Sequence, residues 1–141
     1  MFYSRLNFFP GRLAALMLCF LATLVQAQPA YPDRVINLVV PMPPGGGTDT
    51  VSRLLADKMG QLTGWSLVVQ NKPGATGNIG MDYVARAQPD GYTLGMGQAA
   101  NLAINPAIYP KMPFDPAHDF SLIGLVAAQP VILVVRANSP Y

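Results

Sequence analysis

Twice along the chain a β-strand pattern, a glycine-rich loop and a helical pattern follow one another, and this repeat constrains the fold more than any other feature. In the first unit, a β-branched run at residues 35–40 meets a proline turn, and three consecutive glycines at 45–47 follow. Apolar residues then recur at helical spacing over 51–62. The helix is expected to stop within 60–64, because glycine readily adopts the left-handed conformation that ends helices.

The second unit has the same order. A strand at residues 66–70 leads through a turn-rich loop at 71–77 into apolar residues at helical spacing over 79–87. A weaker third unit begins with a strand at 92–97. Strands that alternate with helices over roughly 30 residues pair in parallel through right-handed crossovers. The chain is therefore predicted to be α/β, with a mostly parallel sheet flanked by helices.

The last third of the chain predicts shorter elements. Residues 101–109 indicate a short helix broken by Pro106, and residues 120–126 and 131–135 indicate two further strands. Nothing after the last apolar run closes the sheet or signals a terminal helix. We therefore expect residues 28–141 to be the N-terminal domain of a longer, truncated protein.

The first 27 residues are typical of a signal peptide. Arg5 and Arg12 supply positive charge, residues 13–25 are an unbroken apolar run, and small side chains precede a predicted cleavage after Ala27. A transmembrane anchor is the alternative, but an anchor needs about 20 apolar residues and this run is shorter. The signal predicts export to the periplasm, with no membrane insertion after cleavage.

Charge and cysteine content narrow the function further. Without Arg5 and Arg12, seven basic residues balance seven aspartates, so the net charge of +2 belongs to the leader. A nucleic-acid partner is not expected, because phosphate neutralisation needs a clustered surplus of Lys and Arg. Cys19, the only cysteine, lies inside the apolar run of the leader. The mature chain therefore has no disulfide, thiolate metal site or cysteine nucleophile.

Both glycine loops follow strands at the edge where open α/β sheets bind ligands. The loops should converge if their strands are neighbours. Glycine lets a ligand approach the backbone, and the first N–H groups of each helix point into that space. Together with the helix dipole they form an anion site that needs no Lys or Arg, and a carboxylate fits it.

The polar residues of these loops each have two interpretations. Asp49 either serves the start of the first helix, accepting backbone N–H bonds as Thr48 also could, or meets an amine or hydroxyl of the ligand. Asn71, Thr76 and Asn78 either bond a ligand oxygen or act as ordinary turn and cap residues. The same alternatives hold for three further residues: Gln98, Asn101 and Asn105.

Several common sites are missing from the sequence. The chain has no G-x-x-x-x-G-K-[ST] phosphate loop and no G-x-G-x-x-G at its first helix, so a nucleotide site is poorly supported. No Cys or His pair stands at metal-ligand spacing, and no G-x-S-x-G elbow offers a nucleophile. We therefore expect no cofactor, no metal and no catalytic residue.

Five motifs resemble the Bug receptors, the extracytoplasmic solute receptors of tripartite tricarboxylate transporters. The motifs occur in order and cover essentially the whole mature chain: VVPMPPGGGTD at 39–49, NKPGATGNIG at 71–80, PDGYTL at 89–94, NPAIY at 105–109, and FDP with DF at 114–120. The family often has an aromatic residue where Met42 stands, so the apolar wall there differs.

The resemblance implies a periplasmic-binding-protein-like fold, here the first domain of a two-domain clamshell whose second domain is absent. It also implies that backbone N–H groups and ordered waters hold a ligand carboxylate, and that the receptor meets membrane transporter subunits transiently. Carried over position by position, the ligand contacts fall on Pro44, Gly45, Gly46, Gly47, Thr48, Asp49, Gly74, Ala75, Thr76, Gly77 and Asn78.

The predicted function is a periplasmic receptor that captures a small organic acid, such as a di- or tricarboxylate, for a tripartite transporter. It is not expected to be an enzyme. The alternative is a secreted or periplasmic α/β enzyme that acts on a small carboxylic acid and uses Asp49 as a base.

Overall fold

The computed structural model describes residues 30–130 and 132–140, and residues 34–141 form one structural unit. The predicted signal peptide at 1–27 lies outside the described residues. Three strands form one parallel sheet in the order β2-β1-β3: β1 (Ile36–Val40), β2 (Leu67–Asn71) and β3 (Thr93–Gly95). The predicted parallel α/β sheet is confirmed.

Strand β1 is the centre of the sheet and of the core. Leu38 lies opposite Val69 of β2 on one side and Leu94 of β3 on the other. Ile36, Leu38, Val39 and Val40 are all buried. A strand covered on both faces needs a continuous apolar run, and β-branched residues fit its pleated surface.

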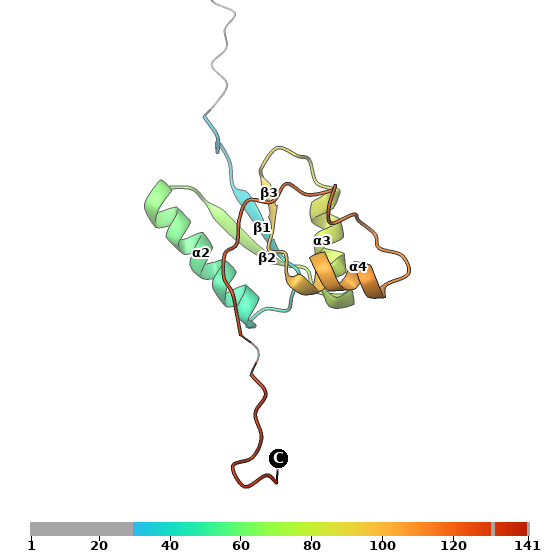
Figure 1. The fold of residues 1–141 in the computed structure, drawn as a ribbon. Coiled ribbons are helices and arrows are strands. Elements are labelled where there is room, and N and C mark those ends of the chain that lie inside the picture. The colour runs from blue at the N-terminus through green and yellow to red at the C-terminus, as the bar shows by residue number, and fades with distance from the viewer. Residues whose placement is uncertain (1–29, 131, 141) are drawn as a thin grey trace, which may run out of the picture. The chain divides into compact units, whose positions relative to one another are not determined.

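The main helices lie on opposite faces of the sheet, α2 (Gly47–Thr63) on one side and α3 (Asn78–Ala85) on the other (Figure 1). This follows from the strand order. The chain moves one way from β1 to β2 and the other way from β2 to β3, so two right-handed crossovers place their helices on different faces. As expected, α2 ends at Gly64, whose φ of 75° is left-handed.

Residues 100–108 are helical without a break, which corrects the prediction of a helix broken by Pro106. A π-helix at Ala100–Ile104 continues directly into α4 (Asn105–Ile108). Pro106 stands in the first turn of α4, where the fixed φ of proline suits the helix. Pro106 therefore helps to start the second helix and does not break a single one.

The predicted strands at 120–126 and 131–135 are not formed in the described part of these segments. Leu122, Leu125 and Leu133 are 81%, 88% and 93% exposed. An apolar run becomes a strand only when a neighbouring strand and a covering layer accept it, and within residues 30–130 and 132–140 neither segment pairs with the sheet. In those same residues, no helix is long and apolar enough to cross a membrane.

Candidate functional site

The two glycine loops meet at the carboxyl edge of the sheet, as predicted. The first loop (residues 41–46) follows β1, and the second loop (residues 72–77) follows β2. The N–H of Lys72 donates to the carbonyl of Val40 at 2.8 Å, and the Nδ2 of Asn71 donates to the carbonyl of Met42 at 3.1 Å. These bonds hold the two loops side by side.

Asp49 connects the loops through one carboxylate. It lies in the first turn of α2 and is 4% exposed. One oxygen accepts from the N–H of Gly45 at 2.9 Å and from the Nε of Arg53 at 3.0 Å. The other accepts from the Nδ2 of Asn71 at 2.9 Å and lies 2.9 Å from the Nη2 of Arg53. Asp49 therefore stabilises the start of α2, and its carboxylate joins Gly45 of the first loop to Asn71, the residue before the second loop.

The bonding of Asp49 also decides what chemistry it can do. The hydrogen bond from Arg53 holds the pKa of the Asp49 carboxyl far below its ordinary value of 3.8, and the bonds from Gly45 and Asn71 lower that pKa further. A general base works best when its pKa is near the operating pH. Asp49 is therefore poorly suited to act as the base of an enzyme, because its pKa is lowered.

The start of α2 offers backbone donors. Its N-cap is Gly46, and no side chain caps the helix there. The first N–H groups of an α-helix have no intrahelical acceptor and carry the positive end of the helix dipole. The N–H groups of Gly47 and Thr48 therefore have no acceptor within α2, and helix N-termini of this kind bind anions. The Oε1 of Gln129 lies close by, 3.3 Å from the position of a Cβ on Gly47.

The second loop is built from unusual backbone conformations. Gly74 and Gly77 have φ values of 132° and 90°, and between them Ala75 and Thr76 have left-handed φ values of 47° and 55°. Left-handed residues other than glycine are strained, and such strain concentrates at binding and active sites. Gly77 directly precedes α3, and the N–H groups of Asn78 and Ile79 already donate to the carbonyls of Ala75 and Gly74 in the loop.

The side chain of Asn78 is already bonded, although the sequence left it open for a ligand. Its Oδ1 accepts from the Nδ2 of Asn105 at 2.7 Å, and its Nδ2 lies 3.6 Å from the sulfur of Met112. The hydroxyls of Thr76 and Tyr109 lie 3.4 Å apart. The second loop is therefore attached to the π-helix and α4 region by polar contacts that no local sequence pattern indicates.

A third loop, residues 96–99 after β3, completes the same edge. The N–H of Met96 donates to the carbonyl of Val39 at 2.9 Å, and the Nε2 of Gln98 donates to the hydroxyl of Thr48. Thr48 is therefore held by Gln98 and does not cap α2. The sequence singled out Gln98 as a candidate residue but gave no sign that its side chain reaches Thr48 at the start of α2.

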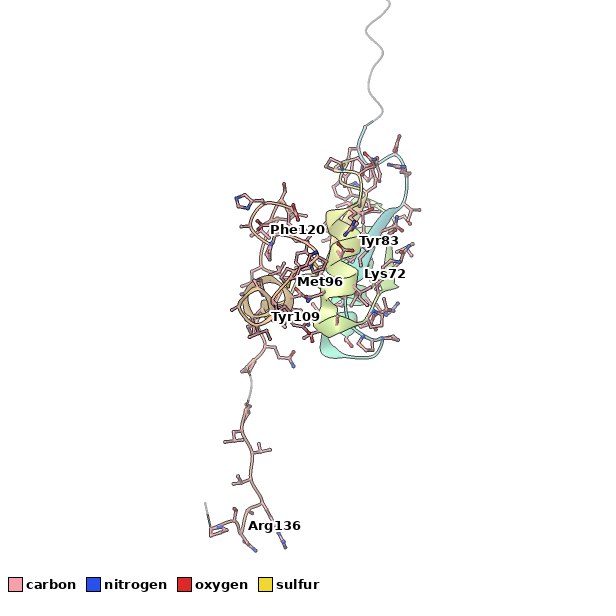
Figure 2. The ribbon with its side chains drawn as sticks, turned by 90° about the vertical axis from the view of Figure 1, so that its right-hand side faces the viewer. Lys72, Tyr83, Met96, Tyr109, Phe120 and Arg136 are labelled. Carbon is pink, nitrogen blue, oxygen red and sulfur yellow. The ribbon has the colours of Figure 1, made fainter. Side chains whose placement is uncertain are left out.

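The cations next to the loops are already paired. Besides its contacts with Asp49, Arg53 donates from Nη2 to the Oδ1 of Asn71 at 3.0 Å. The ammonium of Lys72 lies 4.1 Å from the ring centroid of Tyr83 on α3 (Figure 2). An acid at the loops would thus meet neutral N–H donors first. Among residues 30–130 and 132–140, no group of His, Cys, Asp and Glu could hold a metal ion.

The family described as tripartite tricarboxylate transporter family receptor matches residues 51–141. The chain belongs to this family. The resemblance predicted from the five motifs is thereby confirmed, and the description of the family is that of a receptor.

Relatives agree in sequence and in structure. Protein BugT of Bordetella pertussis is 39% identical over 130 residues, which cover 89% of this chain and 40% of BugT. The periplasmic binding protein BugD is 44% identical with a TM-score of 0.61, over 64% of this chain and 30% of BugD. MatC from Rhodopseudomonas palustris, solved with bound malate, is 38% identical with a TM-score of 0.61, over 64% of this chain and 31% of MatC.

These matches establish a periplasmic-binding-protein-like α/β fold for the receptor chain. The chain spans about 32–40% of the length of the curated relatives it matches. The sheet and loops described above therefore correspond to one part of those longer proteins.

Proposed function

We propose that this receptor captures a small organic acid in the periplasm for a tripartite transporter, and that the two glycine loops hold a carboxylate of that acid. The observation that carries the proposal is the convergence of two helix N-termini at one sheet edge. Both are preceded by glycine, and neither has a side-chain cap. An uncapped helix N-terminus binds anions through its backbone N–H groups and the helix dipole. At α3 the free donors belong to the loop before it, because Asn78 and Ile79 already donate to the carbonyls of Ala75 and Gly74.

The proposed contacts follow the loops. The candidates are Pro44, Gly45, Gly46, Gly47, Thr48 and Asp49 in the first loop and at the start of α2, and Gly74, Ala75, Thr76, Gly77 and Asn78 in the second. Within this set we propose that backbone N–H groups make the direct contacts, except at Pro44, which has no N–H, and at Gly45, whose N–H donates to Asp49. Asp49 and Asn78 hold the loops in place, because their side chains already have protein partners.

Support for the ligand class comes from the solved relative. MatC contains malate, a dicarboxylate. We propose the same class, di- or tricarboxylic acids, for this receptor. We also propose that residues 1–27 are a cleaved signal peptide and that the acid-loaded receptor meets transporter subunits in the periplasm.

The test uses a variant that fills the anion site with its own carboxylate. Gly46 has φ −80°, and a Cβ there would meet only the carbonyl oxygen of Pro43, at 3.8 Å. Gly46→Asp is therefore sterically allowed and places aspartate at an N-cap, where it is favoured and accepts the first N–H groups of the helix. We expect it to keep or raise the melting temperature and to abolish binding of malate, succinate and citrate in calorimetry of the exported protein.

Gly46→Ala is the matched control, because it adds a Cβ without an acceptor. It should bind the acids within a few-fold of the unmodified receptor. If the unmodified receptor binds none of these acids, or if Gly46→Asp binds them as well as Gly46→Ala does, the proposed function is wrong.

A further inference from the structure

Asn101 has a buried hydrogen-bond donor without a partner. The residue is 0% exposed, and within the described part of the chain its Nδ2 is the buried side-chain polar atom that makes no hydrogen bond. An unpaired buried amide donor costs about 1–3 kcal/mol. Native proteins rarely retain such a group unless a ligand or an ordered water satisfies it.

The orientation of this amide is fixed by its other end. The Oδ1 of Asn101 accepts from the N–H of Gln98 at 2.9 Å. Turning the amide over would set its two N–H donors against the N–H of Gln98. The hydrogen-bond network therefore keeps the oxygen toward the third loop and Nδ2 on the opposite side.

The Nδ2 of Asn101 lies next to Gly77 of the second loop, near Pro41 and Met42 of the first loop. A Cβ built on Gly77 would lie 2.6 Å from the Nδ2 of Asn101, 3.3 Å from the Cβ of Pro41 and 3.4 Å from the Cε of Met42. The amide thus comes from the element after β3 and reaches between the loops after β1 and β2. A side chain on Gly77 would block it.

The sheet topology supports a site beside the first and third loops. In the order β2-β1-β3 the strand order reverses at β1, and open α/β sheets bind ligands in the crevice at that switch, here between β1 and β3. Asn101 follows β3 and lies in a π-helix, a conformation that often marks functional sites.

We infer that Asn101 is a ligand-binding residue of this receptor, and that its Nδ2 donates a hydrogen bond to the carboxylate held by the first two loops. The inference rests on the proposed function and extends it to the third loop. The helix N-termini provide N–H donors for one carboxylate oxygen, and Asn101 provides a donor for the other. The pairing removes the unsatisfied donor when the acid binds.

The test compares two substitutions in the exported receptor. Asn101→Asp keeps the acceptor for Gln98 and replaces the donor with an oxygen. Asn101→Leu removes the donor with little change in volume. We expect both to weaken malate, succinate and adipate binding in calorimetry by about 10- to 100-fold, the loss of one hydrogen bond to a charged group. A shared carboxylate predicts a similar loss for all three acids.

Asn37→Asp is the matched control. The Oδ1 of Asn37 accepts from the Nε2 of Gln70 at 2.8 Å, so the same substitution again keeps an acceptor. Asn37 lies in β1, roughly 10 Å or more from the loops by the rise of a strand. It should leave the dissociation constants unchanged, because the added charge is far from the acid.

The outcomes separate the two proposals. Binding by the unmodified receptor with unchanged dissociation constants in folded Asn101→Leu contradicts this inference and leaves the proposed function intact. A loss confined to malate contradicts the carboxylate assignment, because only malate carries a hydroxyl. No binding by the unmodified receptor contradicts both. Circular dichroism establishes that each variant titrated is folded.

Discussion

At the scale of single residues, the carboxylate of Asp49 accepts hydrogen bonds from Gly45, Arg53 and Asn71. Its place at the start of a helix was predictable from the glycines before it and the helical period after it. The i,i+4 spacing to Arg53 also indicates an ion pair. The bond to Asn71 was not predictable, because it depends on β2 pairing with β1 so that the ends of both strands lie side by side.

The first prediction concerns pH. Asp49 has a lowered pKa in the folded state, so its carboxylate stabilises the fold above its ordinary pKa of 3.8, and this stabilisation is lost as the pH falls toward the folded pKa. Asp49→Asn cannot ionise. Its free energy of unfolding, measured by urea titration, should be lower than that of the unmodified chain near pH 7, and the difference should shrink below about pH 4.

Asp57→Asn on the same helix is the control. The Asp57 carboxylate accepts from the Nε2 of Gln61 at 2.8 Å, and both side chains are exposed to solvent. The same change of residue should therefore leave the pH profile close to that of the unmodified chain. An Asp49→Asn profile parallel to the unmodified one from pH 7 to about pH 3 would refute the linkage.

At the scale of elements, the strands and helices before residue 96 follow their local patterns because pattern and tertiary setting agree. The β-branched run of β1 is central in the sheet. The apolar periods of α2 and α3 face that sheet only in part, because Leu54, Leu62 and Ile79 are 59%, 81% and 57% exposed. The run at 120–126 is also apolar but has no neighbouring strand, and it forms no strand. Propensity alone could not distinguish the two cases.

The second prediction tests the packing of α3 against the first loop. A Cβ on Gly80 would lie 2.7 Å from the carbonyl oxygen of Lys72 and 2.8 Å from the Cα of Pro41. Both are backbone atoms, so the helix must shift. Gly80→Ala should lower the free energy of unfolding by about 1–3 kcal/mol, although alanine is the better helix former. Urea titration gives this difference.

Gly60→Ala in α2 supplies the contrast. A Cβ there would meet only the carbonyl oxygen of Trp65, at an ordinary 3.4 Å. Alanine should be neutral or stabilise the chain by up to about 1 kcal/mol, because glycine loses more backbone entropy on folding. Equal effects of the two substitutions would show that α3 does not press against the first loop.

At the scale of the whole molecule, the sequence predicted where the loops converge but not how many elements meet there. Convergence follows from parallel strand order, a general property of α/β folds. The part played by Asn101 depends on the path of the chain after β3, where a π-helix turns the amide toward Gly77. No periodicity in the sequence encodes that turn, so only the folded chain reveals the third loop.

The last prediction concerns the apolar segment at residues 121–135. Its leucines at 122, 125 and 133 are almost fully exposed, and contiguous exposed apolar surface promotes dye binding and self-association. The chain from residue 28 to 141 should therefore bind the dye ANS and scatter more light as its concentration rises. Replacing the three leucines by lysine should reduce both signals while the circular dichroism spectrum is unchanged, because these side chains bury little surface.

The control adds three lysines in and just after the same segment and replaces only serine and alanine, so the three leucines remain. Ser121→Lys, Ala127→Lys and Ala137→Lys are also at exposed positions. If charge alone governs association, this triple variant lowers the ANS signal as much as the leucine variant does, and the apolar segment is not the cause. If the exposed leucines govern it, the control keeps most of the dye binding, because Leu122, Leu125 and Leu133 still present their side chains to water.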